Sequence, residues 1–259
     1  PINLMSGIRS KVNEIYSLEQ LSIKNTIIHN IHPLIKMIVT VVYIVCILSV
    51  RRYDLLRFSY FLFYLIITTA LAELPLKIVI KRTMIALPFV LFAGISNLII
   101  NRETAFFIGR IAITYGLISF VVLIIRTMFS VWALLILIAT TRFSDLTKQL
   151  IRLHIPPLIV NLMEMIYRYI GVLAEEVSTM LVSYRLKNPA YKWPHIKHMG
   201  PFVGNLFLKS INKAERIYNA MKCRGYGSKQ VAYQKEKIAL KDIVFFLVCT
   251  VSSVIFVIL

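Results

Sequence analysis

Long runs of apolar residues occupy much of the first half of the chain and return at its end. A helix that crosses a bilayer core about 30 Å thick needs roughly 20 predominantly apolar residues. Five stretches reach or approach this length, and the pattern therefore predicts about five membrane-spanning helices. They are Leu34–Val50, Leu55–Leu71, Met84–Ile100 (with Pro88 and Gly94), Gly116–Ala139 and Leu240–Leu259. Ala105–Tyr115 is also apolar and predicts either an interfacial helix or an extension of the fourth span.

Between the fourth and fifth apolar stretches the chain is polar but keeps a helical period. Apolar residues recur at three- and four-residue steps after Pro156-Pro157, and again over about Pro201–Lys222. This spacing predicts two long amphipathic helices, of the kind that lie at a membrane surface or pack on a partner. Proline fits the first turn of a helix and stops a helix elsewhere. We therefore expect Pro189 and Pro194 to form the hinge between the two helices.

The composition favours a membrane protein. Hydrophobic residues make up 58% of the chain and charged residues 16%, whereas a globular domain is roughly 45–50% apolar. Lys and Arg outnumber Asp and Glu by 30 to 12, a net charge of +18. Such a surplus is typical of nucleic-acid binding, of contact with anionic lipid, or of the cytoplasmic loops of a membrane protein. The apolar runs favour the last, so we expect a lipid bilayer and no nucleic acid as partner.

The distribution of charge predicts an orientation for the spans. The segment 140–237 holds 16 Lys and Arg against 6 Asp and Glu, and positive charge near span ends favours the cytoplasm. With this segment inside, five spans place the N-terminus inside and the C-terminus outside. Arg51, Arg52 and Arg57 oppose this orientation, because it puts them in an outer loop. The predicted divisions are a four-span region (1–139), a cytoplasmic region (140–238) and a last span (239–259).

Each predicted amphipathic helix ends on cations followed by a capping residue. The second ends at Arg224-Gly225, and glycine just past a helix adopts the left-handed conformation without steric cost. The first ends at Arg185, Lys187 and Asn188, and asparagine is the next-best left-handed residue. A plain helix stop explains both ends, since a cation there also suits the helix dipole. The functional alternative is that the cap directs the Arg224 guanidinium at a carboxylate, which arginine binds through two parallel hydrogen bonds.

Arg126 lies midway along the fourth predicted span. A charge in hydrocarbon costs at least about 2.5–3.5 kcal/mol on insertion scales, so this side chain is expected to face protein or to reach one membrane surface. No Asp or Glu lies inside a clear span to pair with it. We therefore favour a packing role for Arg126 over a transport role.

No catalytic or metal centre is predicted. Four of the five histidines form two pairs three residues apart, His29 with His32 and His195 with His198. Two ligands without a nearby carboxylate or thiolate make a poor metal site, and the three cysteines include no CxxC pair. Phosphate-binding loops of the GxxxxGK[ST] kind, GxSxG and HExxH are absent from the sequence. We expect no enzyme activity and no cofactor in this chain.

Four segments carry a resemblance to a known family. They are "IHPLIKMI" (Ile31–Ile38), "ATTRFSDL" (Ala139–Leu146), "LHIPPLIVNLMEMIYRYIGVLAEE" (Leu153–Glu176) and "GNLFLKSINKAERIYNAMKCRGY" (Gly204–Tyr226). The chain resembles the transmembrane T component of energy-coupling factor (ECF) transporters, in the CbiQ branch of cobalt and nickel importers. The last segment is the most specific match. The first departs from the family pattern, with His32 in place of Asp and Leu34 in place of Arg.

The resemblance implies an all-α membrane protein with about five spans and two long cytoplasmic coupling helices. In the family, an Ala-Arg-Gly-type motif at the tip of each coupling helix docks in a groove of one ATPase subunit. The second motif corresponds here to Cys223-Arg224-Gly225. The first falls at Leu186-Lys187-Asn188, where Arg and Gly are both lost, so either Lys187 or Arg185 makes the first contact and the two contacts are expected to be unequal.

The resemblance also implies the partners. They are two ABC ATPase subunits, which bind the ATP, and a separate substrate-binding subunit in the same cell membrane. The expected cargo is Co²⁺, with Ni²⁺ or a vitamin as alternatives. From a different functional class, a passive membrane anchor for a soluble acidic protein stays open. An intramembrane enzyme would need polar catalytic groups at one membrane depth, and the sequence offers none.

Overall fold

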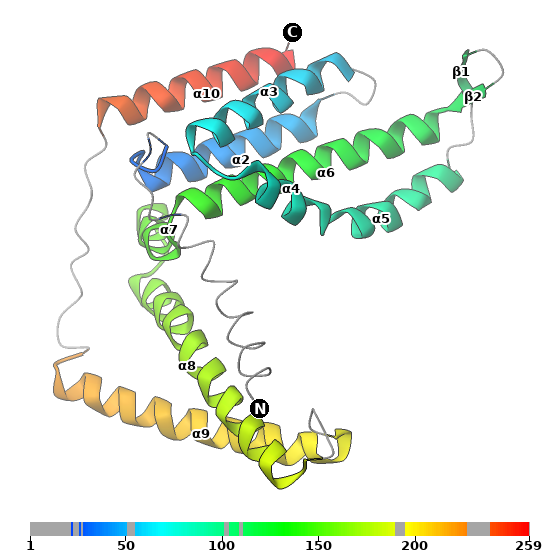
Figure 1. Ribbon diagram of the computed structural model, residues 1–259. Coiled ribbons are helices and arrows are strands. Elements are labelled where there is room, and N and C mark those ends of the chain that lie inside the picture. Colours follow the sequence, from blue (N-terminus) through cyan, green and yellow to red (C-terminus); the bar gives the residue numbers. More distant parts are fainter. Residues whose placement is uncertain are drawn as a thin grey trace. The chain divides into compact units, whose positions relative to one another are not determined.

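The computed structural model describes residues 22, 26, 28–50, 55–100, 104–108, 111–189, 195–226 and 239–258 (Figure 1). They fall into two compact units. The core unit consists of the described residues within 18–149 and 237–259, and the hairpin unit of those within 150–236. The predicted divisions after residues 139 and 238 concern the bilayer and stay predictions. The predictions for Arg51, Arg52 and Pro194 lie outside the described residues.

Helices make up most of the core unit, which confirms the predicted all-α class. Four of the five predicted spans are helices whose described ends lie within one residue of those expected from the apolar pattern. They are α2 (Pro33–Ser49), α3 (Leu55–Leu71), α6 (Tyr115–Thr140) and α10 (Leu240–Ile258). A short helix, α7 (Phe143–Leu150), follows α6.

The third predicted span is wrong at its start. Two helices, α4 (Leu76–Met84) and α5 (Leu87–Ile100), flank a turn at residues 85–86. Pro88 is the second residue of α5, where its missing N–H removes no helical hydrogen bond. Taken across the turn, Leu76–Ile95 is long and apolar enough to cross a membrane, as are Gly116–Thr140 and Pro157–Lys187. Pro33–Ser49 and Phe58–Leu71 are shorter apolar helices.

The segment before α6 also differs from the prediction. Ala105–Tyr115 was expected to be helical, but β1 (Thr104–Ile108) pairs antiparallel with β2 (Ile111–Thr114), and α6 begins only at Tyr115. The strands are rich in Ile, Thr and Phe, and β-branched and aromatic residues favour a strand over a helix. Apolar character alone did not distinguish the two.

The long helix α6 is the centre of the core unit, where it contacts α2, α3, α4 and α5. Figure 1 shows it running along the other helices of this unit. The fully buried Tyr43 of α2 donates its hydroxyl to the carbonyl oxygen of Phe61 at 3.1 Å and stacks on Tyr64, both in α3. Trp132 of α6 donates its indole N–H to the hydroxyl of Thr69 at 3.1 Å. Each buried polar atom in these contacts therefore has a partner.

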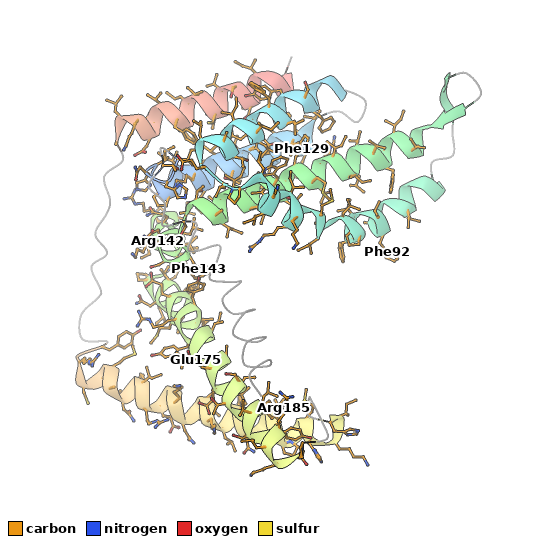
Figure 2. All side chains as sticks on the ribbon, viewed as in Figure 1. Phe92, Phe129, Arg142, Phe143, Glu175 and Arg185 are labelled. Carbon is orange, nitrogen blue, oxygen red and sulfur yellow. The ribbon has the colours of Figure 1, made fainter. Side chains whose placement is uncertain are left out.

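Large apolar side chains stay exposed on the surface of the core unit. Phe89 and Phe92 of α5 are 83% and 81% exposed, and Figure 2 shows Phe92 on the outer side of that helix. Lipid tails solvate such side chains whereas water does not, so an exposed apolar surface of this kind indicates a membrane.

The hairpin unit contains the two amphipathic helices, α8 (Pro157–Lys187) and α9 (Ile196–Cys223), with a short 3₁₀ turn, η1 (Ile151–Leu153), before them. The start predicted for α8 after the proline pair is confirmed. The start predicted for α9 is wrong, because the helix begins five residues before Pro201. The His195 side chain accepts from the N–H of Lys197 and caps the helix at Ile196, so Pro201 lies inside it.

Gly94 allows α5 to lie close to α6. A Cβ atom at this position would stand 2.5 Å from Cδ2 of Phe120, too close for any real contact. We expect Gly94→Ala to lower the free energy of unfolding by about 1–3 kcal/mol through overpacking, although alanine is the better helix former. Thermal unfolding of the purified chain in detergent measures this.

Gly204→Ala is the matched control, because the added Cβ meets nothing within 4 Å. That variant should be as stable as the unmodified chain or more so. In a Phe120→Ala background, Gly94→Ala should cost less than it does in the unmodified chain. Equal stability of the two single variants would contradict the close approach of α5 to α6.

Candidate functional site

The C-terminal end of α9 has the backbone geometry predicted from Arg224-Gly225. Gly225 is left-handed, with φ of 81°. Its N–H donates to the carbonyl oxygen of Lys222 at 2.9 Å, and the N–H of Tyr226 donates to that of Met221 at 3.0 Å. These two bonds form a complete Schellman cap. The cap ends the helix at Cys223 and leaves Arg224 exposed.

The end of α8 differs from the prediction. Asn188 has φ of −133°, so it is not left-handed, and its N–H donates to the carbonyl oxygen of Tyr184 at 2.9 Å. The physical reason is Pro189, because a residue that precedes proline is pushed towards extended backbone. Lys187 is exposed and Arg185 is half-buried. The two helix ends are therefore not equivalent.

An ion pair and a cluster of hydrogen bonds around Tyr184 join α8 to α9. Lys209 Nζ donates to Oε1 of Glu176 at 2.6 Å. The Tyr184 hydroxyl is hydrogen-bonded to Nδ1 of His198 at 2.7 Å and accepts from the N–H of His195 at 3.3 Å. The hydrogen bond from Lys209, together with the positive charges of Lys209 and Lys213, holds the pKa of the Glu176 carboxyl below its ordinary value of 4.5.

Away from these contacts, the two helices enclose an apolar groove of about 650 Å³. Its lining includes Leu158, Leu162 and Ile166 of α8 and Ile211 and Tyr218 of α9. These side chains follow the three- and four-residue steps that predicted the helices. In the hairpin unit, therefore, the apolar stripes line an open groove.

A second cleft, of about 390 Å³, adjoins the groove at the Arg224 end of α9. It shares five lining residues with the groove: Met165, Tyr169, Ile217, Met221 and Tyr226. Its polar and charged lining includes Asn161, Glu164, Arg168 and Arg224. Of these four residues, only Arg224 was predicted from the sequence as a site residue. The three polar residues of α8 were not predicted, although their i, i+3, i+7 spacing places them on one helical face.

The ion pair between Lys209 and Glu176 gives the hairpin unit a pH dependence. Because the carboxylate form is favoured in the folded chain, the pair contributes stability above pH 4.5, and this is lost as the pH falls through the lowered pKa. The free energy of unfolding of the unmodified chain should exceed that of Lys209→Met near pH 6, and the difference should shrink on acidification below pH 4.5.

Thermal unfolding over this pH range measures the difference. In a Glu176→Gln background, Lys209→Met should produce no pH-dependent change. A difference that persists there would assign the effect to another carboxylate.

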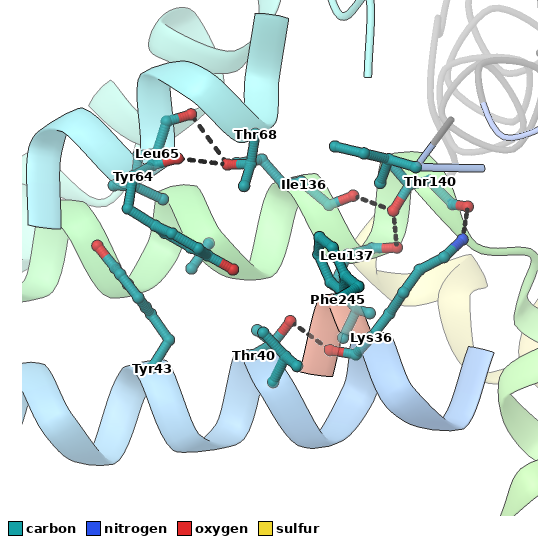
Figure 3. Close-up of a pocket in the computed structure, with 13 residues that line it drawn as sticks. Lys36, Thr40, Tyr43, Tyr64, Leu65, Thr68, Ile136, Leu137, Thr140 and Phe245 are labelled. Carbon is teal, nitrogen blue, oxygen red and sulfur yellow. Dashed lines mark hydrogen bonds between the residues drawn. The ribbon is translucent and has the colours of Figure 1, made fainter. Parts of the chain in front are cut away.

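In the core unit, a buried lysine joins the first two sequence motifs. Lys36 is only 5% exposed. Its ammonium group donates to the carbonyl oxygens of His29 and Thr140, each at 3.0 Å, and Figure 3 shows it reaching Thr140 at the end of α6. Lys36 also lines a small cavity of about 40 Å³ with Thr40 and Tyr43. The ammonium therefore satisfies two carbonyl oxygens that a hydrocarbon environment would leave without a donor.

Asp242, in the first turn of α10, accepts hydrogen bonds from two backbone N–H groups. It is 3% exposed, and its carboxylate accepts from the N–H of His32 at 3.2 Å and from that of Ala239 at 2.9 Å. The expectation that no acid lies inside a predicted span is therefore wrong at this position. His32 replaces the family's aspartate as the cap of α2, because its Nδ1 accepts from the N–H of Leu34 at 3.2 Å.

We expect Lys36→Met to destabilise the core unit by about 1–3 kcal/mol, because two buried carbonyl oxygens lose their donor. Methionine keeps most of the volume of lysine, so the loss reports the ammonium group and not the packing. Thermal unfolding in detergent measures it. Lys77→Met, at an exposed position of α4, is the control and should leave stability unchanged; an equal effect of both variants would contradict the role given to Lys36.

Arg126 contacts the end of a neighbouring helix, which agrees with the packing role predicted for it; that role stays a prediction. Its guanidinium donates to the carbonyl oxygen of Val50, the residue that ends α2. A cation at the C-terminal end of a helix satisfies an orphan carbonyl and suits the helix dipole. Arg126 therefore caps a neighbouring helix from within α6.

The histidine pairs serve as local hydrogen-bonding groups. Nδ1 of His29 is hydrogen-bonded to the Thr26 hydroxyl at 2.6 Å, and His32, His195 and His198 make the contacts given above. Within the described ranges, no group of three or more His, Cys, Asp or Glu side chains is placed to hold a metal ion.

The arrangement of apolar core helices and a charged amphipathic hairpin agrees with a family match. The model of the CbiQ cobalt transport proteins matches residues 24–233. The chain belongs to this family. All four motif segments fall within or at the edge of the matched range, and the most specific of them, Gly204–Tyr226, forms most of α9 and its cap.

Two relatives support the assignment. An uncharacterized protein of Methanocaldococcus jannaschii, MJ1571, is 28% identical over 258 residues, which cover 95% of this chain and 87% of the relative. The nickel permease LarQ of Lactiplantibacillus plantarum is 30% identical over 92 residues, 36% of this chain and 34% of the relative.

Membership of the family gives the general role of the protein. CbiQ proteins are membrane components of ECF-type cobalt and nickel transport systems and work within transporter complexes. This chain is accordingly a transport protein of a membrane. The coupling roles of Arg224, Lys187 and the residues beside them stay predictions.

Proposed function

We propose that this chain is the energy-coupling subunit of an ECF-type importer, joining two ABC ATPase subunits to a substrate-binding subunit in the cell membrane. The observation that carries the proposal is the end of α9, where a Schellman cap stops a 28-residue helix and leaves Arg224 exposed. ATP is bound by the ATPase subunits, and this chain carries no cofactor. The proposed cargo is Co²⁺, and the resemblance to a nickel permease makes Ni²⁺ the alternative.

The charges of α8 support a position of the hairpin unit in water. By length and composition α8 is able to cross a membrane. However, Arg168, Glu175 and Glu176 lie in its middle, and each charge held at the centre of a bilayer costs roughly 2.5–3.5 kcal/mol or more. A helix that lies along the membrane surface or on a partner keeps these groups hydrated.

The spacing of the two helix ends supports two separate ATPase contacts. The bond between Tyr184 and His198 holds the end of α8 beside the start of α9. Since α9 has 28 residues and rises about 1.5 Å per residue, Arg224 lies roughly 40 Å from that point. A stiff helix of this length transmits displacement, so closure of the two ATPases would move both ends together and pass the motion to the substrate-binding subunit.

The two contacts are proposed to be unequal. At α9 an arginine follows a glycine-capped helix, whereas at α8 the corresponding residues are Lys187 and Asn188, without the left-handed turn. Arginine binds a carboxylate through a fixed fork, while lysine is a mobile point charge. Arg185, half-buried on α8, is the other candidate for the first contact.

We expect Arg224→Ala to reduce the retention of ATPase subunits more than Lys187→Ala, because a lost charge partner costs about 2–5 kcal/mol when the other charge is left buried. Co-purification from membranes measures retention, and cellular uptake of Co²⁺ and Ni²⁺ measures transport. Arg216→Ala removes one exposed charge from α9 and is the control.

Loss of both retention and uptake in Arg224→Ala is the expected result. Lost retention with normal uptake would instead favour a passive membrane anchor. A greater loss in Lys187→Ala would overturn the correspondence of the two helix ends to the family motifs.

A further inference from the structure

The cleft beside Arg224 has a mixed lining that points to a particular occupant. Arg168 and Arg224 both line it, one from each helix, and both are exposed. Both guanidinium groups are cationic, so the part of the cleft that they line favours an anionic occupant. Each guanidinium presents a planar fork that matches a carboxylate.

The other polar lining residues favour a carboxylate over a phosphate. Glu164 brings a negative charge into the same cleft, so two cations and one anion leave a surplus of one positive charge. This surplus balances a single carboxylate and would leave a doubly charged phosphate in excess.

The apolar side of the cleft defines the neighbour of that carboxylate. Met165, Ile217 and Met221 line both the cleft and the apolar groove, so the two spaces share one wall. A segment whose acidic side chain enters the cleft would therefore place an adjacent apolar side chain over the groove. Burial of that side chain would add the hydrophobic contribution that a surface ion pair lacks.

We propose that this cleft receives an acidic side chain of an ATPase subunit, held between Arg168 and Arg224, with a neighbouring apolar side chain in the groove. The inference rests on the proposed function and adds Arg168 to the docking surface. In this proposal the end of α9 and one face of α8 together form the binding site for a partner segment. The helix end is therefore not the whole of the contact.

The test compares ATPase retention in membranes for full-length chains with Arg168→Ala, Arg224→Ala, both together, and Arg216→Ala, which lines neither cavity. Arg168→Ala should reduce retention roughly tenfold or more, and Arg168→Lys less, because it keeps the charge without the fork. Because both arginines hold one carboxylate, the double variant should lose much less than the product of the single losses.

The outcomes separate this inference from the proposed function. If Arg224→Ala weakens retention while Arg168→Ala behaves like Arg216→Ala, the cleft proposal is overturned and the coupling role stands. If Arg224→Ala also has no effect, the coupling role itself fails. Losses that multiply in the double variant would show two independent ligands and overturn the shared carboxylate. Thermal unfolding of each variant identifies any general loss of structure, and Arg168→Lys then replaces Arg168→Ala in the comparison.

Discussion

The hydrogen bonds from Lys36 to the carbonyl oxygens of His29 and Thr140 satisfy the constraint on which the core unit depends. Hydrocarbon offers no water to backbone groups at helix ends, so the protein has to supply their partners itself. Asp242 does this for two N–H groups beside α2 and α10, and Arg126 does it for the carbonyl oxygen of Val50. Lys36, Asp242 and Arg126, charges inside the apolar part of the chain, therefore each bind backbone groups at the ends of neighbouring helices.

The same requirement is met differently in the hairpin unit, which we propose to lie in water. There the helix ends are satisfied locally, by the Schellman cap at Gly225 and by the bond from Asn188 to Tyr184. Local caps leave the charged side chains at these ends available to a partner. The apolar stripes of α8 and α9 meet only loosely and line a groove of about 650 Å³. An amphipathic pair with an open groove is suited to bind another protein, which agrees with membership of a family that works in complexes.

The departures from the family motifs have different consequences. His32 replaces an aspartate but still accepts a hydrogen bond at the start of α2, because a neutral imidazole nitrogen is also an acceptor. At Lys187-Asn188, which replace Arg-Gly, the left-handed turn of the motif is lost. Asn188 does not restore it, because Pro189 holds its backbone in an extended conformation. A motif position defined by one hydrogen bond thus tolerates a change of residue type, whereas one defined by a left-handed turn does not.

The apolar runs and their period determined the number, type and approximate ends of the main helices, because helix formation and burial in lipid depend on neighbours within a few residues. Gly225 likewise determined its own turn. Periodicity does not decide between helix and strand for β1 and β2. Nor does it fix the break before α5 or the early start of α9. Only the tertiary structure brought Lys36 to Thr140 and His32 to Asp242, which are 104 and 210 residues apart in the chain, and Arg168 into the cleft of Arg224. Such pairs depend on how whole helices pack, and no short window of sequence contains both partners.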